Sequence, residues 1–251
     1  MNYKEKELYE KQYRIWKICL YIAGTLALVL FFYICRFVRF AAHRYQLNNT
    51  VREAVTQMAQ LTSNIRVFYS VHYTDPIPSI QKMVEMGALP ISLFKDQIIA
   101  NPFGGQIVIE QSKPFRYKKN NTLMATFKIS YQGLSHEACV RLATINWGGS
   151  EQGLVAMAAG IVKSDGTDTA LKDIDDNFST QQTFEKKNTE GKKRTIHAAV
   201  HYKMNVAKPE NNFSPVPFSE EAAHVACECE QYENCSFALN YTLDGYIGKQ
   251  N

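Results

Sequence analysis

The sequence predicts an α+β protein in which a long N-terminal transmembrane helix packs on an antiparallel β-sheet head with short helices. An apolar block opens the chain, no glycine or proline lies between Gly24 and Pro76, and strand-like segments then alternate with short capped helices. The 251 residues are 45% hydrophobic and carry 28 basic and 24 acidic side chains. The resulting net charge of +4 is too close to neutrality for a disordered chain and too small to indicate a nucleic-acid partner.

Residues 18–35 are apolar or uncharged throughout. About 20 apolar residues cross the hydrocarbon core of a bilayer, and further apolar residues extend the block, so we expect a membrane-spanning helix over 18–40. The block is too long for a cleaved signal peptide, and no small-x-small cleavage site follows it. A buried helix of a soluble domain also fits poorly, because apolar residues occur all round the helix for five turns.

Basic residues flank the block on both sides. The larger number precedes it, which predicts a cytoplasmic N-terminus and a periplasmic C-terminal part. Four of the six cysteines lie in that distal part, where an even number suits an oxidising compartment. The flanking basic residues are Lys4, Lys6, Lys11, Arg14 and Lys17 before the block and Arg36, Arg39 and Arg44 after it.

The helix is expected to continue beyond the membrane, from about residue 15 to residue 69 in one piece. A stripe of apolar residues follows the membrane block at alternating steps of three and four, which places them on one helical face. That face would pack either on the protein's own head or on a matching helix in a dimeric coiled coil. The stripe consists of Leu47, Val51, Ala54, Met58, Leu61, Ile65 and Phe68.

The next segments follow local start and stop signals. Residues 79–87 read as a short helix, residues 106–111 and 123–131 as a β-hairpin, and residues 135–145 as a helix with Ser135 as its N-cap. A tight turn is expected immediately before the hairpin. The turn residues are Asn101, Pro102, Phe103, Gly104 and Gly105.

The later part of the chain is less regular. Residues 164–194 are polar and are expected to form a mobile loop. A strand is expected over 195–206, a capped helix from Ser219, and a final strand over 235–243.

The cysteines carry the strongest chemical signal. Cys139, Cys227, Cys229 and Cys235 can form two disulfides in three different pairings, which an exported domain would favour. The same region reads His-x2-Cys-x-Cys-x5-Cys from His224, so a tetrahedral zinc site is the alternative. We expect disulfides and no metal.

Other constellations are weaker. No nucleophile elbow, phosphate-binding glycine loop or paired acid motif is present, so we expect no catalytic residues, no cofactor and no enzyme activity. The aspartates between 165 and 176 could bind calcium, although they lack the EF-hand pattern. The basic residues near the end of the polar segment 164–194 could bind an acidic partner. These groups are Asp165, Asp168, Asp173, Asp175 and Asp176; Lys186, Lys187, Lys192, Lys193 and Arg194; and the surface pair His197 and His201.

The order of these motifs resembles the type IVb pilins, especially the conjugative thick-pilus and toxin-coregulated kind. The likeness rests on the extended helix ending in Leu61-Thr-Ser-Asn-Ile-Arg-Val-Phe-Tyr69, the Met-Gly-Ala-Leu-Pro run at 86–90, and the turn at 101–105. The segment Glu137-Ala-Cys-Val-Arg-Leu-Ala-Thr144 and a small-residue helix containing Cys227 complete it. Residues 20–145 carry most of the resemblance.

The resemblance implies a bacterial inner-membrane subunit whose helix packs in a filament spine. It also implies a disulfide from Cys139 to Cys227 or Cys229. The prepilin cleavage motif is absent, because Gly24 lies inside the apolar block and no acidic residue follows it within the span. The resemblance therefore favours a permanently anchored, pilin-like component over a major pilin.

The predicted organisation is a cytoplasmic segment at 1–17, a transmembrane helix at 18–40, its amphipathic continuation at 41–75 and a periplasmic globular domain at 76–251. Such a single-pass protein would act by assembly in a type IV pilus, conjugation or secretion apparatus. Its partners would be the membrane and other pilin-like or secretion-apparatus subunits, including copies of itself. The alternatives are a membrane-tethered binding or adhesin domain that does not polymerise, and a metal-dependent or thiol-active periplasmic enzyme.

Overall fold

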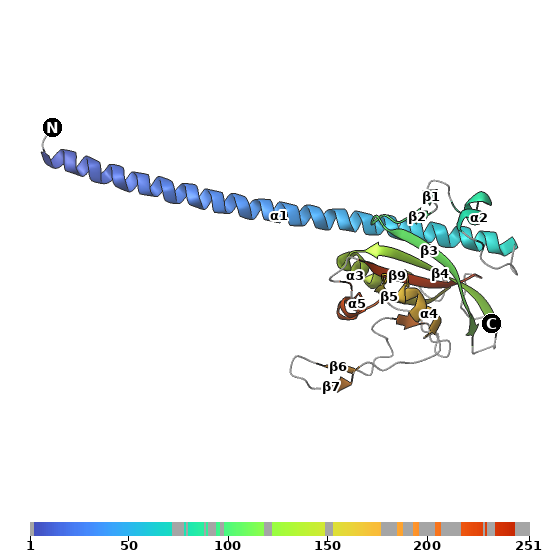
Figure 1. The fold of residues 1–251 in the computed structure, drawn as a ribbon. Coiled ribbons are helices and arrows are strands. Elements are labelled where there is room, and N and C mark those ends of the chain that lie inside the picture. Colours follow the sequence, from blue (N-terminus) through green and yellow to red (C-terminus); the bar gives the residue numbers. More distant parts are fainter. Residues whose placement is uncertain are drawn as a thin grey trace. The chain divides into compact units, whose positions relative to one another are not determined.

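The computed structural model divides into two compact units, Met1–Asn49 and Thr50–Asn251, with helix α1 (Tyr3–Val71) running through the boundary (Figure 1). Each unit is described by itself. The described residues are 3–71, 78, 80–87, 89, 94, 95, 98–117, 122–148, 153–176, 185–187, 193–195, 204–206, 217–227, 229 and 234–243.

The first unit exposes its apolar side chains. Among the described residues, α1 is the one helix long and apolar enough to cross a membrane. No residue of its most apolar 18-residue window is buried in the protein, and Phe32 and Tyr33 are 68% and 78% exposed. A helix of a soluble protein would bury side chains of this kind in the protein core. The exposed apolar surface of α1 is therefore suited to an apolar environment.

The second unit is built on a seven-stranded sheet in the order β1-β2-β3-β4-β9-β5-β8, in which every neighbouring pair is antiparallel. Strand β9, the last along the described part of the chain, lies between β4 and β5 in the interior of the sheet (Figure 1). The bounds are β1 Phe94–Lys95, β2 Ile98–Ala100, β3 Gln106–Tyr117, β4 Thr122–Leu134, β5 Leu154–Ile161, β8 Met204–Val206 and β9 Cys235–Thr242.

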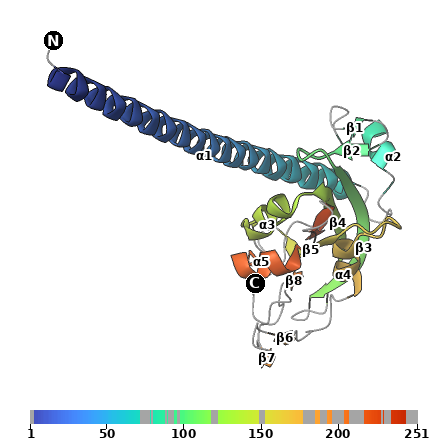
Figure 2. The same cartoon turned by 60° about the vertical axis from the view of Figure 1, so that its left-hand side comes forward.

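In the described part of the chain, four short helices and a small ribbon accompany the sheet. The ribbon pairs β6 (Glu185–Lys187) with β7 (Lys193–Thr195). Helices α3 and α5 lie side by side in both views (Figure 2). The helices are α2 Ile80–Glu85, α3 His136–Thr144, α4 Thr169–Asp176 and α5 Glu220–Ala226. The predicted α+β class is confirmed.

Apolar and polar side chains alternate along β4, so the two faces of the sheet differ in character. Phe127, Ile129 and Tyr131 are fully buried and point to α1, where the Tyr131 hydroxyl donates to the Ala54 carbonyl at 3.0 Å. The intervening side chains, among them Ser130, point to the opposite face, which α4 covers. The sheet is therefore packed between α1 on one side and α4 on the other.

Helix α4 approaches the sheet closely because β5 presents a glycine to it. A Cβ atom at Gly160 would collide with Thr169 Oγ1 and would lie 2.7 Å from the Ala170 backbone nitrogen. The Thr169 hydroxyl donates to the Ile161 carbonyl, and the Ile161 amide donates back to that hydroxyl. The absence of a side chain at Gly160 of β5 thus allows α4 to pack closely on the sheet.

Local signals located several elements correctly. The hairpin is confirmed as β3 and β4, both longer than expected, and the final strand as β9. Ser135 and Ser219 are confirmed as N-caps, each accepting a hydrogen bond from the backbone amide three residues later. The helix expected over 79–87 is α2, and Gly87 follows it with φ +74°.

The expected loop over 164–194 is wrong. That segment contains α4, whose residues Ala170 and Ile174 are fully buried, as well as β6 and the start of β7. Polar residues outnumber the buried ones in this short helix, so its sequence looks like that of a loop. Of the strand expected over 195–206, Thr195 closes β7 and Met204–Val206 form β8; residues 196–203 lie outside the described residues.

Candidate functional site

The apolar stripe of α1 is mostly buried inside the second unit. Ala54, Leu61 and Ile65 are fully buried, and Met58 and Val51 nearly so. Within this unit the stripe therefore packs on the protein's own sheet, and these side chains are not available to a partner helix. Leu47 belongs to the first unit and is partly exposed, and Phe68 is partly buried with its ring edge-to-face on Tyr69.

The turn before the hairpin is organised by one side chain, that of Asn101. Its amide nitrogen donates to the Gln106 and Gln132 carbonyls, and its oxygen accepts from the amides of Phe103 and Gly105. Gly104 has φ +90°, a conformation that favours glycine. A Cβ at Gly105 would collide with the Gln132 carbonyl. The turn locks β3 to β4, with Pro102 and Phe103 at its partly exposed tip.

Two disulfides close the C-terminal region. Cys139 of α3 is bonded to Cys227 at the end of α5, with Cα atoms 6.0 Å apart, and Cys229 is bonded to Cys235 at the start of β9, with Cα atoms 5.2 Å apart. All four cysteines are buried. Of the three pairings that the sequence allows, this one links the α3–α5 pair to the central strand.

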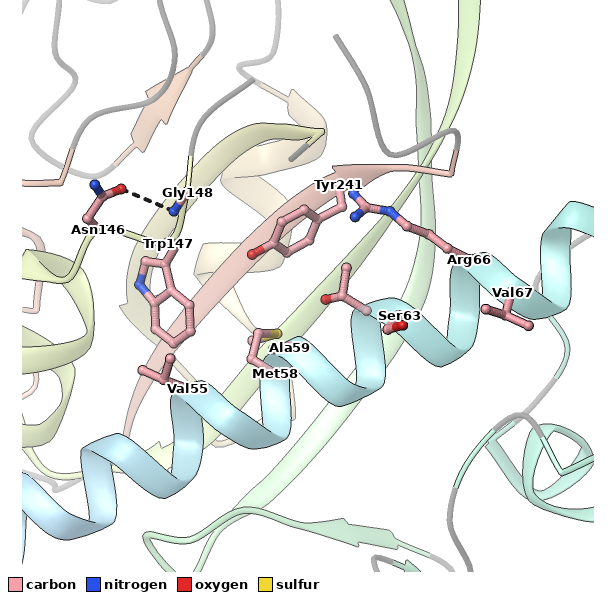
Figure 3. Close-up of a pocket in the computed structure, with 11 residues that line it drawn as sticks. Val55, Met58, Ala59, Ser63, Arg66, Val67, Asn146, Trp147, Gly148 and Tyr241 are labelled. Carbon is pink, nitrogen blue, oxygen red and sulfur yellow. Dashed lines mark hydrogen bonds between the residues drawn. The ribbon is translucent and has the colours of Figure 1, made fainter. Parts of the chain in front are cut away.

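A groove of about 570 Å³ lies between α1 and the residues Trp147 and Tyr241 in the second unit (Figure 3). The α1 side chains Val55, Ala59 and Ser63 line one wall, and Trp147 and Tyr241 line the other. Most of this lining is apolar. Among the described lining residues Arg66 is the one with a charged side chain, so the groove can hold an apolar surface but has no acid–base pair for catalysis.

Arg66 lies at one end of this groove, with its guanidinium 5.3 Å from the centroid of the Tyr241 ring (Figure 3). Its Nε donates to the Thr242 carbonyl at 3.1 Å. Burial lowers the pKa of Arg66, and the nearby Tyr241 opposes that shift. The side chain joins the end of α1 to the central strand by a hydrogen bond and a cation–π contact.

Two buried tyrosines make the head sensitive to alkali. Burial raises the pKa of Tyr131 and of Tyr241, and for Tyr241 the neighbouring Arg66 partly opposes the shift. In the unfolded chain a tyrosine loses its proton near pH 10, whereas these two keep theirs in the folded protein. The unfolded state then binds fewer protons, so stability is present below about pH 10 and is lost as pH rises further.

We expect the free energy of unfolding to fall by about 1.4 kcal/mol per pH unit for each of these tyrosines above roughly pH 10.5. Tyr131→Phe should remove one such contribution from the slope, and Tyr241→Phe the other. Urea unfolding of the full chain in detergent at several pH values measures the slopes. A Tyr131→Phe slope equal to that of the unmodified protein would contradict this assignment.

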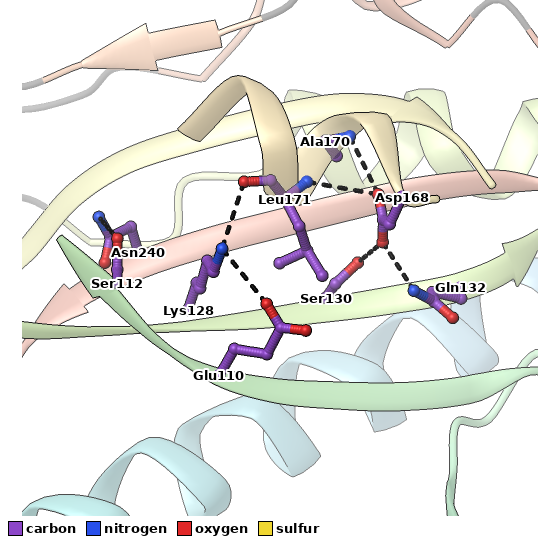
Figure 4. A network of polar contacts seen from close by, with 9 residues as sticks. All are labelled: Glu110, Ser112, Lys128, Ser130, Gln132, Asp168, Ala170, Leu171 and Asn240. Carbon is purple, nitrogen blue, oxygen red and sulfur yellow. Dashed lines mark hydrogen bonds and ion pairs between the residues drawn. The ribbon is translucent and has the colours of Figure 1, made fainter. Parts of the chain in front are cut away.

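The opposite face of the sheet carries a buried polar network centred on Asp168 (Figure 4). Its Oδ1 accepts from the Ser236 hydroxyl at 2.6 Å and from the amides of Ala170 and Leu171 at 2.9 and 3.3 Å. Its Oδ2 accepts from the Ser130 hydroxyl at 2.6 Å and from Gln132 Nε2 at 2.8 Å. One carboxylate therefore caps α4 and ties it to β4 and β9.

Asp168, one of the five aspartates of the calcium alternative, belongs to this network. Asp168 is only 7% exposed, and both its oxygens accept hydrogen bonds from the protein. Asp165 is exposed and caps its own turn through the Thr167 amide, whose hydrogen bond lowers the pKa of the Asp165 carboxyl. Asp168 and Asp165 are thus used separately, by a helix cap and by a surface turn.

Lys128 extends from β4 beside this network and is almost fully buried. Its Nζ lies 3.3 Å from Glu110 Oε2 and 3.5 Å from the Leu171 carbonyl (Figure 4). An open pocket of about 480 Å³ lies over these groups. The lysine connects β3, β4 and α4, which is a structural use of a buried cation.

Sequence reasoning missed a contact between His136 and His224. Their rings lie with His136 Nε2 2.9 Å from His224 Nδ1, although 88 residues separate them in the chain. Only the pairing of α3 with α5 brings them together. The side chains of Lys186, Lys187, Lys193 and Arg194, together with Lys192, His197 and His201, lie outside the described residues.

The comparisons with known proteins identify a family. A comparison with curated protein sequences finds no match. A family model described as Bundlin matches residues 46–197, which is more than half of the chain and includes α1 from residue 46 on, the turn, the hairpin, α3, β5 and α4. The long apolar helix, the antiparallel sheet and this match agree, and the chain belongs to the bundlin family of pilins.

Proposed function

We propose that this pilin-family chain is a permanently membrane-anchored subunit of a bacterial type IV pilus, conjugation or secretion apparatus. It acts by assembling with other subunits rather than by catalysis. Its N-terminus would be cytoplasmic and its head periplasmic, in a single-pass topology across the inner membrane. Its neighbours would be copies of itself or related pilin-like subunits.

The observation that carries this proposal is the exposed apolar surface of the first unit. Leu26, Phe31 and Val38 are each more than half exposed, and side chains of this kind surround the helix rather than forming one stripe. In water such a surface would aggregate, whereas in a bilayer it satisfies a span of about 20 residues. The span contains Gly24 but no acidic residue, which supports retention of the whole helix as an anchor.

The internal contacts of the second unit support the proposal that the head is already folded when it assembles with partners. Its stripe is already covered by its own sheet, and its bridges and the Asp168 network hold the helices on that sheet. Partners would therefore meet the apolar membrane surface of α1 and the outer faces of the head. The disulfides suit an oxidising periplasm, which supports the proposed orientation.

Site-directed photo-cross-linking in native membranes tests this proposal. A photoreactive side chain at Leu28, which is exposed on the apolar surface, should give covalent products with a second copy or a related subunit in alkali-washed membranes. The same group at Met58, which is nearly fully buried in the head, should give no product between chains, because the head's own sheet covers it.

The two positions distinguish assembly from simple tethering. Products at Leu28 and none at Met58 would support a membrane-embedded subunit contact. Monomer alone at Leu28, in chains that remain in the washed membranes, would favour a tethered binding domain. Release of the chain by the alkaline wash would contradict the anchor itself.

A further inference from the structure

The end of the head that carries the disulfides also gathers two imidazoles. His136 is the first residue of α3, and His224 lies in the last turn of α5. Ligand atoms of His136, Cys229 and Cys235 all lie within 4.8 Å of one another, and His224 Nδ1 is 2.9 Å from His136 Nε2. Two sulfurs and the His136 imidazole therefore converge, and the His224 imidazole lies against that of His136.

The hydrogen bonds of His136 define which of its nitrogens can bind a metal. Its Nδ1 lies 2.6 Å from the Cys227 carbonyl oxygen, which can only accept, so Nδ1 carries the proton. In the neutral ring Nε2 then presents its lone pair toward His224. Metal-binding histidines typically donate one ring N–H to a backbone carbonyl and bind the metal with the other nitrogen. His136 has the bond to the carbonyl already in place, and its Nε2 now lies against His224 Nδ1.

We propose that, when Cys229 and Cys235 are in the dithiol form, they bind one Zn²⁺ ion together with His136 and His224. The two thiols become thiolates and release two protons as the metal binds. With Zn–S bonds of about 2.3 Å and Zn–N bonds of about 2.0–2.1 Å, tetrahedral ligand atoms lie roughly 3.3–3.8 Å apart. The ligand atoms of His136, Cys229 and Cys235 lie within 4.8 Å of one another, and His224 Nδ1 lies 2.9 Å from His136 Nε2. Forming the site requires these side chains to rotate, and two Zn–N bonds replace the hydrogen bond between the imidazoles.

Zinc and the Cys229–Cys235 disulfide exclude each other, because bridged sulfurs are not thiolates. The cysteines are synthesised as thiols, so the zinc form would precede the bridge. A disulfide-donating oxidoreductase would then accept the two electrons of the thiolates, take up two protons, leave as a dithiol and release Zn²⁺. The metal would thus hold β9 and α5 beside α3 until oxidation replaces it with the covalent bond.

Cobalt and zinc titrations of the full chain in detergent test this site. The protein is reduced anaerobically with a phosphine, which takes one oxygen atom from water as the disulfide becomes two thiols. We expect one metal ion per chain, with thiolate-to-cobalt charge-transfer absorption that zinc abolishes. The oxidised protein should bind at least roughly 100-fold more weakly, since even loss of outer-shell partners costs 10- to 100-fold.

Variants assign the ligands. The Cys229→Ser/Cys235→Ser variant should lose the charge-transfer absorption, and His136→Asn should weaken zinc binding by roughly 100-fold or more. His43→Asn changes an exposed histidine of α1 and should have no effect on binding. Because His136→Asn keeps all four cysteines, circular dichroism of its oxidised form shows independently whether the variant folds.

Three results would overturn the site. Equal metal affinity of the reduced and oxidised proteins would remove the role of the thiols. Thiolate absorption that persists in Cys229→Ser/Cys235→Ser would assign the metal to Cys139 and Cys227. Unchanged affinity in a folded His136→Asn variant would exclude the imidazole. None of these results bears on whether the chain assembles in membranes.

Discussion

Replacing Asp168 by alanine is expected to lower the free energy of unfolding of the head by about 3–5 kcal/mol. The change removes the cap of α4, typically worth about 1 kcal/mol, and leaves buried donors without an acceptor at about 1–3 kcal/mol each. These contributions are not additive, because the donors belong to one network and can rearrange into the space that the carboxylate leaves. The expected loss is therefore smaller than their sum.

The donors come from three segments, which is why the effect should be large. Ser130 and Gln132 belong to β4, Ser236 to β9, and the amides of Ala170 and Leu171 to α4 itself. Asp168→Asn keeps the shape and one acceptor oxygen but places an NH₂ group near existing donors. It should cost less than alanine, about 1–3 kcal/mol.

Urea unfolding of the full chain in detergent, followed by the fluorescence of buried Trp147, measures these losses. The matched control is Asp165→Ala, three residues earlier in the same loop, which removes an exposed carboxylate that caps only its own turn. Its effect should stay within about 0.5 kcal/mol. Equal losses for the two alanine variants would show that the network does not hold α4 on the sheet.

The elements that the sequence predicted are those whose signals lie within a few residues. Ser135 and Ser219 each cap the helix that begins at the next residue. Apolar and polar residues alternate along β4 of the hairpin, and the Asn101 side chain accepts hydrogen bonds from backbone amides of the turn before it. Such features depend little on the rest of the fold, so the local sequence suffices to locate them.

The missed elements depend on distant partners. Strand β5 consists largely of small residues that look unremarkable until Gly160 is seen to admit α4. Helix α4 has few apolar residues, and its cap Asp168 reads in sequence as one of several aspartates. The side chains that donate hydrogen bonds to this aspartate are those of Gln132, Ser130 and Ser236, which lie 36, 38 and 68 residues away along the chain.

The same reasoning explains the cysteines. Spacing alone leaves three pairings, because cysteines 88 residues apart can be bridged only if the fold brings them together. The packing of α3 on α5 brings Cys139 to Cys227 and so selects one of the three pairings. The same packing brings His136 to His224. No local pattern joins these residues, so only the tertiary structure reveals the cluster.

Removal of the Cys139–Cys227 bridge is expected to destabilise the head more than removal of Cys229–Cys235. A cross-link restricts the unfolded chain in proportion to the logarithm of the loop that it closes. With sequence separations of 88 and 6, the loop terms are about 4.5 and about 2.3 kcal/mol. The double alanine variants should therefore differ by about 2 kcal/mol in their free energies of unfolding.

The comparison is well matched because all four cysteines are buried to nearly the same extent. Truncating two sulfurs leaves a similar loss of packing in each variant, so the difference between the variants reports mainly on loop length. Urea midpoints of the two variants, measured in detergent beside the unmodified protein, give that difference. If Cys229→Ala/Cys235→Ala were the less stable variant, the short bridge would be doing more than restricting the unfolded chain. The closure of α3 on α5 would then owe its stability to packing rather than to the long-range bond.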